Sequence, residues 1–205
     1  MELFDPETLA DLKFRAKKQL RLRQRGLRSA HAEAVLTEAS SRICERVLAL
    51  PEFMAASGVG LFWPMSERRE VDVRPLLEAA LGAGKRAYFP FLTPKAEGFQ
   101  TGFRQLTNAS ELLDRGQRFV EPPLDAPLAL RGEIDLLIVP ALAAAADGHR
   151  LGYGMGFYDA TLPDFCPPAR AVVVLYDFGL LGELPATDND VRCDFIVTER
   201  RTLVI

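Results

Sequence analysis

A glycine-rich segment around residue 155 has residue types suited to holding an anion. It reads RLGYGMGFYD from Arg150 to Asp159 and places glycines at positions 152, 154 and 156. Glycine has no Cβ to separate the backbone N–H groups from an anion, and a helix that follows such a loop adds its dipole. Arg150 adds a planar guanidinium that can bind phosphate oxygens. The segment therefore indicates phosphate binding, although the same spacing also occurs in an ordinary tight turn.

Two common nucleotide-binding patterns do not fit this segment. A dinucleotide fingerprint that starts at Gly152 would need its last glycine at position 157, but that residue is Phe157. A Walker A loop would need a Gly-Lys-Ser/Thr sequence, and none follows the glycines. A dehydrogenase and a standard P-loop ATPase are therefore disfavoured.

Two aspartates lie where they could serve a metal ion. Asp159 ends the glycine-rich segment, and Asp190 lies in the turn TDNDVRCD after Pro185. Mg²⁺ usually takes one or two carboxylates and completes its shell with water and phosphate oxygens. Either aspartate could instead cap a helix or a turn, which is a frequent use of this residue. A magnesium site and a structural role are both consistent with the pattern.

The N-terminal region concentrates positive charge. Residues 13–28 contain eight Lys and Arg side chains and no acidic one, whereas the whole chain has a net charge of −3. Lys17, Arg21, Arg25 and Arg28 share one face if a single helix carries them all. Such a face is most often solvated, but it could also bind RNA, an acidic membrane or the phosphates of ATP. The acidic balance of the whole chain disfavours general nucleic-acid binding.

Other reactive side chains give weaker signals. Trp63, the single tryptophan, could stack on a flat heterocycle or pack in the core, and Glu70 by itself is typical of a surface glutamate. Cys44, Cys166 and Cys193 are odd in number and far apart. A disulfide framework and a zinc site are therefore disfavoured, and a reducing cytoplasm is the expected location.

Hydrophobic periodicity predicts the elements that must position these residues. Helices are predicted over 7–25, 30–49, 73–83 and 155–162. In the second helix the residues predicted to face the core are Val35, Ala39, Ile43 and Val47. Strands are predicted over 57–63, 86–90, 101–106, 134–140, 171–176, 194–198 and 202–205. The segment IDLLIVP at 134–140 is apolar throughout, as in a parallel sheet that is covered on both faces.

This alternation predicts a three-layer α/β/α sandwich with a mainly parallel central sheet, Rossmann-like in type. The 205 residues suit one domain over 1–205. Residues 1–12 are expected to form a loosely ordered N-terminal extension, although the helical period begins within them at Glu7. The N-terminus lacks the apolar stretch of a secretory signal, and no run of eighteen apolar residues occurs, so no membrane association is expected.

Five segments together resemble the 5-formyltetrahydrofolate cyclo-ligase family, also called the methenyltetrahydrofolate synthetases. The segments are KKQLR (17–21), GLFWPMSERREVDVRPLLEAALGAGKRAYFP (60–90), IDLLIVPALA (134–143), RLGYGMGFYDATL (150–162) and LPATDNDVRCDFIVT (184–198). The resemblance runs from about Lys17 to Val197, and the pattern RLGxGxGxYD is its most specific part. It implies conversion of 5-formyltetrahydrofolate and ATP to 5,10-methenyltetrahydrofolate, ADP and phosphate, with Mg²⁺.

The resemblance also implies a role for each matching position. ATP contacts are implied for Lys17, Lys18, Arg21, Arg150, Leu151, Gly152, Tyr153, Gly154, Met155, Gly156, Phe157 and Tyr158. Contacts with the folate are implied for Trp63, Glu70, Tyr153, Gly154, Met155, Gly156 and Phe157. Asp159 and Asp190 would hold Mg²⁺, and Arg150 and Lys17 would act in catalysis by stabilising the transferring phosphoryl group.

The expected partners are therefore two small molecules, ATP and a reduced folate, rather than nucleic acid or a membrane, and a monomer and a homodimer are both open. Two alternatives stand beside the enzyme. Met155 lies where relatives often carry glycine or lysine, which would suit a relative that binds folate or a nucleotide without cyclising it. The other alternative is an RNA-binding protein that uses the basic N-terminal helix.

Overall fold

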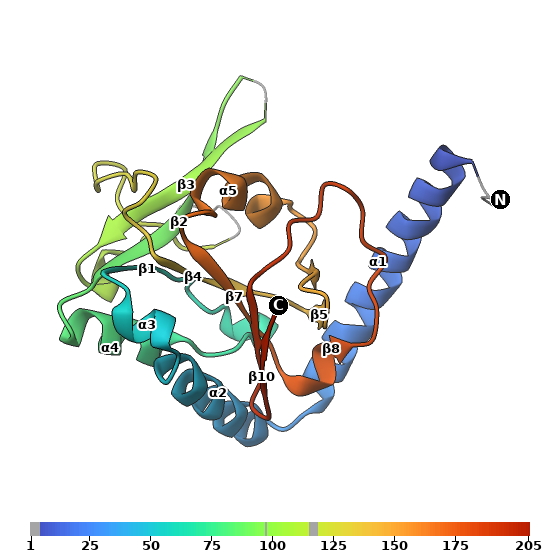
Figure 1. Cartoon of the computed structure of the whole chain (residues 1–205), viewed down its shortest axis with the longest axis horizontal. Coiled ribbons are helices and arrows are strands. Elements are labelled where there is room, and N and C mark those ends of the chain that lie inside the picture. The colour runs from blue at the N-terminus through green and yellow to red at the C-terminus, as the bar shows by residue number, and fades with distance from the viewer. Residues whose placement is uncertain (1–4, 97, 115–118) are drawn as a thin grey trace.

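The computed structural model describes residues 5–96, 98–114 and 119–205. Its α-helices are α1 (Pro6–Ala30), α2 (Glu33–Leu48), α3 (Pro51–Ala55), α4 (Arg74–Gly82) and α5 (Phe157–Phe165). Its strands are β1 (Gly58–Gly60), β2 (Arg86–Pro94), β3 (Phe99–Leu106), β4 (Leu136–Pro140), β5 (Ala143–Ala145), β6 (Arg150–Leu151), β7 (Arg170–Val174), β8 (Leu180–Leu181), β9 (Phe195–Val197) and β10 (Thr202–Val204). Figure 1 shows a layered body with α1 set to one side.

A seven-stranded sheet forms the centre, in the order β10-β9-β7-β4-β1-β2-β3. The strands from β9 to β2 are parallel, and the edge strands β3 and β10 are antiparallel to their neighbours. The predicted mainly parallel sheet is confirmed. Counted along the chain, the five parallel strands lie in the order 2-1-3-4-5, a common doubly wound order that differs from that of dinucleotide-binding domains. The order reverses between β1 and β4, and ligands of such sheets bind at the carboxyl ends of the strands at that point.

Two apolar clusters cover the two faces of this sheet. On one face α2 and α4 pack against the strands, and the buried residues there include Ile43, Val47, Leu76, Val59, Ile138 and Val172. On the other face α5 packs, with Phe157, Leu162, Phe165, Leu137, Val139 and Val173. Successive side chains of a strand point to opposite faces, so an all-apolar strand such as β4 serves both clusters. The predicted three-layer arrangement is confirmed.

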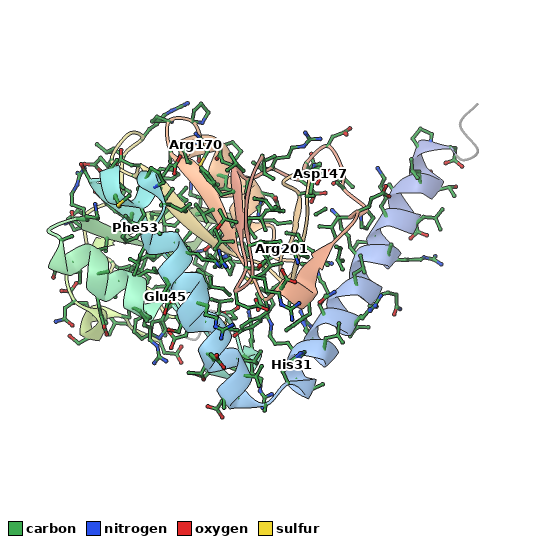
Figure 2. All side chains as sticks on the ribbon, turned by 60° about the horizontal axis from the view of Figure 1, so that its bottom comes forward. His31, Glu45, Phe53, Asp147, Arg170 and Arg201 are labelled. Carbon is green, nitrogen blue, oxygen red and sulfur yellow. The ribbon has the colours of Figure 1, made fainter. Side chains whose placement is uncertain are left out.

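Helix α1 lies apart from these layers and begins earlier than predicted. Pro6 occupies its first turn, and Asp5 caps it by accepting a hydrogen bond from the Thr8 backbone N–H at 2.9 Å. Residues 6–12 are therefore helical rather than loosely ordered, and residues 1–4 lie outside the described part of the chain. The C-terminal half of α1 runs beside β8, and its N-terminal half projects from the body (Figures 1 and 2).

The predicted core face of α2 is wrong at its first position. Val35 is exposed, and its neighbour Leu36 is buried instead. Seven residues make nearly two full helical turns, so position 36 lies directly below Ile43, whereas position 35 is rotated by roughly 80° from it. Ala39, Ile43 and Val47 are buried as predicted.

A second, three-stranded sheet carries the glycine-rich segment. Its order is β6-β5-β8, and its strands have only two or three residues each. The glycines at 152, 154 and 156 lie between β6 and α5, so one end of their loop is fixed by the small sheet and the other by a helix.

Figure 2 shows His31 at the point where α1 ends and α2 begins. The His31 ring stacks on the Phe178 ring, with 4.5 Å between the two ring centroids.

None of the described helices is both long enough and apolar enough to cross a membrane. Helix α1 has sufficient length, with 25 residues, but charged side chains occur along all of it.

Candidate active site

A cavity of about 330 Å³ opens at the carboxyl ends of β1 and β4, where the strand order reverses. Phe62 and Trp63, which follow β1, and Pro140, which ends β4, all line it. Every site residue predicted from the sequence also lines this cavity, with the exception of Lys18. Lys18 is exposed on α1 because consecutive helical residues point about 100° apart. The fold therefore brings three distant parts of the chain, α1, the glycine loop and the turn at Asp190, to one place.

Two of the three glycines of the loop adopt backbone conformations that favour glycine. Gly154 has φ of 97° and Gly156 has φ of 70°, both in the left-handed region that favours glycine. Gly156 is also the N-cap of α5, so the loop ends at the positive end of a helix dipole. Arg21 of α1 donates a hydrogen bond from Nε to the carbonyl oxygen of Gly152 at 3.0 Å. The loop is thereby held against a cation from the first helix.

Substitution of Gly154 by alanine is expected to lower kcat/KM by about tenfold, which corresponds to roughly 1–2 kcal/mol of backbone strain. An added Cβ would lie 3.3 Å from Cζ of Arg21, so the arginine would also have to move. Gly82→Ala is the matched control, because nothing lies within 4 Å of its added Cβ. Steady-state kinetics on the two variants check this, and a wild-type rate for Gly154→Ala would contradict it.

Arg150 and Asp159 form an internal ion pair at the edge of the cavity. Arg150 donates from Nη2 to Oδ1 of Asp159 at 2.7 Å and from Nη1 to the Val191 carbonyl oxygen at 2.5 Å. Its side chain is only 3% exposed. The sequence suggested that this guanidinium binds phosphate, but here both of its Nη atoms donate to protein groups, although Arg150 still lines the cavity. Its visible effect is to hold Asp159, which the Val191 backbone N–H also contacts at 3.2 Å.

Lys17 and Asp190 form a second pair, which joins α1 to the late acidic turn. Nζ of Lys17 donates to Oδ1 of Asp190 at 2.8 Å, and the backbone N–H and hydroxyl of Thr187 donate to Oδ2 at 2.6 and 2.9 Å. Burial raises the pKa of Asp190, but these hydrogen bonds outweigh it and hold the pKa below its ordinary value. Asp190 is therefore ionised at neutral pH.

Asp159 and Asp190 both have oxygen donors that a magnesium ion shared with a phosphate would need. Asp159 is the less engaged of the two, because both oxygens of Asp190 already accept hydrogen bonds from Lys17 or Thr187. Both Asp159 and Asp190 line the cavity, and the two contacts of Asp159 with Arg150 and Val191 use the same oxygen, Oδ1. No cluster of three or more His, Cys, Asp or Glu side chains suited to a metal occurs among the described residues. Mg²⁺ does not need one, since two carboxylates with water and phosphate oxygens complete its shell.

Trp63, Tyr153 and Glu70 line the cavity as well, together with the cation Arg68. Oε2 of Glu70 accepts a hydrogen bond from the Met65 backbone N–H at 2.9 Å. Burial raises the pKa of Glu70, and hydrogen bonds from Met65 and Tyr153 act against that rise. A half-buried carboxylate and an indole that line one cavity suit a flat heterocycle that carries N–H donors.

Much of the basic face of α1 is turned toward the body of the protein. Lys17 and Arg21 line the cavity, and Arg28 is buried. An RNA-binding surface would need these cations on the outside, where they could reach phosphates. Their placement disfavours the RNA-binding alternative.

Comparison with known proteins shows the family of the chain. A sequence model described as the 5-formyltetrahydrofolate cyclo-ligase family matches residues 13–199. The chain belongs to this family. The 5-formyltetrahydrofolate cyclo-ligase of Escherichia coli (strain K12) is 33% identical over 163 residues, which cover 78% of this chain and 88% of the relative. A mitochondrial 5-formyltetrahydrofolate cyclo-ligase of Arabidopsis thaliana is 28% identical over 208 residues, covering 90% and 74%.

Solved structures of methenyltetrahydrofolate synthetases share the fold. The structure of the Aquifex aeolicus 5,10-methenyltetrahydrofolate synthetase superimposes with a TM-score of 0.78 at 27% identity, over 92% of both chains. That of the Mycoplasma pneumoniae synthetase gives 0.69 at 20% identity, over 89% of this chain and 98% of the other. The predicted cyclo-ligase family, fold class and enzymatic nature are confirmed.

Several cavity residues of this cyclo-ligase family member were missed by sequence reasoning. They are Phe14, Phe62, Met65, Arg68, Pro90, Phe119 and Pro140. Phe62 and Pro140 could have been found, because each lies at the carboxyl end of a predicted strand on either side of the point where the order reverses. Pro90 lies within β2, where the strand predicted over 86–90 ends. Met65, Arg68 and Phe119 lie outside the predicted elements, and Phe14 comes from the projecting part of α1, where no period indicates the inward direction.

Proposed function

We propose that this cavity binds ATP and 5-formyltetrahydrofolate together and cyclises the folate to 5,10-methenyltetrahydrofolate, with release of ADP and phosphate. The observation that supports it is the composition of one continuous cavity. Its lining combines two sets of residues, namely Lys17, Arg21 and the glycine loop as one set and Trp63 and Glu70 as the other. The first set suits a triphosphate and the second a pterin, so the two substrates would lie in contact.

The nucleotide part would hold the triphosphate by charge and by backbone donors. The loop at 152–156 ends at the N-terminus of α5, where N–H groups and the helix dipole favour an anion. Arg21 is fixed on this loop and lines the cavity, so its charge would lie close to the phosphates. Asp159 and Asp190 are the residues that would hold Mg²⁺, which when bound neutralises phosphate charge.

The folate part would recognise the pterin ring. The Trp63 indole is partly buried and lies 6.5 Å from the Phe89 ring, so it is supported from the core side. The Glu70 carboxylate can accept hydrogen bonds from the amino and ring N–H groups of a pterin. These contacts would place the formyl group toward the triphosphate.

The proposed reaction proceeds through a phosphorylated formyl oxygen. A formamide is unreactive because its nitrogen lone pair is delocalised into the carbonyl. Transfer of the γ-phosphoryl group to the formyl oxygen releases ADP and turns that oxygen into a leaving group. The second folate nitrogen then attacks the formyl carbon and loses its proton, and the carbon–oxygen bond breaks to release phosphate. No protein nucleophile is required, so the chain contributes positioning and charge stabilisation.

A spectrophotometric assay for methenyltetrahydrofolate tests this function. The purified chain is expected to form the product in proportion to ADP, and only when ATP and Mg²⁺ are both present. Absence of ATP-dependent product at saturating Mg²⁺, with folate still bound, would favour the non-cyclising alternative. That alternative has one supporting observation, because Met155 lines the cavity where a lysine would add a cation.

A further inference from the structure

Arg28 is a buried cation near the end of α1 that the proposed reaction does not use. It is 3% exposed. Nη1 donates to Oη of Tyr153 at 2.6 Å and to the Arg68 carbonyl oxygen at 3.4 Å, and Nη2 donates to the Ala141 carbonyl oxygen at 3.0 Å. Among the described residues no carboxylate forms an ion pair with Arg28. A buried charge is costly unless it is well hydrogen-bonded, so its neutral partners must be held accurately in place.

The Tyr153 hydroxyl links Arg28 to the folate part of the cavity. It accepts the hydrogen bond from Arg28, and it lies close enough to the Glu70 carboxylate to help lower the pKa of that group. The Tyr153 ring also lies below two further cations, with Cζ of Arg68 at 4.8 Å and Cζ of Arg25 at 5.9 Å from its centroid. Tyr153 is thus bonded to Arg28 in the interior of the protein and lines the same cavity as Glu70.

Glu70 meets charged and polar groups from several elements. Met65 and Arg68 face it from its own segment, Arg28 from α1, and Tyr153 from the glycine loop. The Tyr176 hydroxyl donates to the Glu70 backbone carbonyl at 3.2 Å, and Tyr158 lies close enough to be affected by the carboxylate charge. Burial raises the pKa of Glu70, whereas Met65, Tyr153, Arg28 and Arg68 act to lower it. Arg28 therefore favours the ionised carboxylate.

We infer that Arg28 is a positioning residue, which fixes the Tyr153 ring and, through its hydroxyl, orients the Glu70 carboxylate toward the bound folate. The inference rests on the proposed function, in which Glu70 receives the pterin. Arg28 does not line the cavity, so its effect would reach the folate through its neighbours, of which Tyr153 makes the shortest contact with it. Loss of Arg28 should weaken folate binding and leave ATP binding nearly intact.

Isothermal titration calorimetry with 5-formyltetrahydrofolate alone, and with ATP and Mg²⁺ alone, tests this at several pH values. Arg28→Met is expected to weaken folate binding by about tenfold at neutral pH, the effect of one lost hydrogen bond to a charged group. Binding that needs the carboxylate is lost as the pH falls through the pKa of Glu70. Since Arg28 lowers that pKa, its removal should move the loss to higher pH. Arg28→Lys should restore part of the affinity.

A double-mutant cycle with Tyr153→Phe separates this role from general structural damage. Tyr153→Phe should shift the pH profile in the same direction as Arg28→Met, and the double variant should show little further change. If Arg28→Met does not fold, Tyr153→Phe decides the question, and an unshifted profile overturns the inference. Arg23→Met removes an exposed charge from the same helix and should match the wild type.

Two further results would contradict the inference. Fully additive effects in the cycle, or equal losses of folate and ATP affinity, would show that Arg28 does not act through Tyr153 and Glu70. If the wild-type protein binds no 5-formyltetrahydrofolate at any pH, the proposed function itself fails, and the inference fails with it. The wild-type titration therefore distinguishes the two failures.

Discussion

Replacement of Lys17 by methionine is expected to lower the turnover of 5-formyltetrahydrofolate by about a hundredfold. The Lys17 ammonium lines the cavity and lies 2.8 Å from Oδ1 of Asp190. Methionine keeps most of the side-chain length but removes the charge that would face the triphosphate, and it leaves the Asp190 carboxylate without its cation. Both changes disfavour a transition state in which negative charge spreads over the transferring phosphoryl oxygens. Steady-state kinetics should show a lower kcat and a higher KM for ATP.

The adjacent residue provides a matched control for this variant. Lys18→Met removes the same charge from the same helical turn, but Lys18 is exposed and does not line the cavity. Its turnover is expected to stay within about twofold of the wild type, as is usual for surface changes. Equal losses in the two variants would show that the net charge of α1 matters rather than the position of Lys17. Thermal melts of both proteins would establish that they are folded.

The Asp159→Asn variant is expected to lose about a hundredfold in turnover as well, for a different reason. The substitution keeps the size and one acceptor oxygen of the side chain, so the contact with Val191 can persist. It removes the negative charge that would bind Mg²⁺ and that neutralises Arg150, whose side chain is 3% exposed. The Mg²⁺ concentration needed for half-maximal rate should therefore rise, and the melting temperature should fall because a buried charge loses its partner.

Asp164→Asn is the control for this second variant, because Asp164 is exposed on the same helix, α5. Its rate and its Mg²⁺ dependence should equal those of the wild type. Near wild-type turnover for Asp159→Asn, measured with saturating ATP and folate, would refute the assigned role of this carboxylate. An unchanged Mg²⁺ requirement with a lower rate would assign Asp159 to the support of Arg150 alone.

The helices and strands that form the core could be predicted from sequence, because burial determines where apolar residues recur along them. The apolar segment that contains β4 is buried on both faces of a parallel sheet, and its composition alone indicated this. The strands β5, β6 and β8 were not predicted, since two or three residues carry no period. The short helix α3 was missed too, although Pro51 is well placed to begin one.

For the site, the sequence indicated which residues belong to it but not which of them contact one another. Gly154 and Gly156 could be assigned to a loop because positive φ angles favour glycine. Arg150 could be placed near Asp159 but not paired with it, since a guanidinium suits a carboxylate and a phosphate equally well. Arg28 shared a predicted face with Lys17 and Arg21, yet whether that face met solvent or protein depended on contacts with Ala141 and Tyr153, which are distant in the chain. Tertiary contacts of this kind have no local sequence signal.

The spacing along α1 restricts which insertions and deletions the protein can tolerate. Lys17 and Arg28 are eleven residues apart, which at 1.5 Å per residue is roughly 16 Å along the helix axis. The Lys17 side chain contacts Asp190, and the Arg28 side chain contacts Tyr153. An extra residue between them would rotate one end by about 100° relative to the other, so only one of the two contacts could be kept. Length variation should therefore be accepted before Lys17 but not between Lys17 and Arg28.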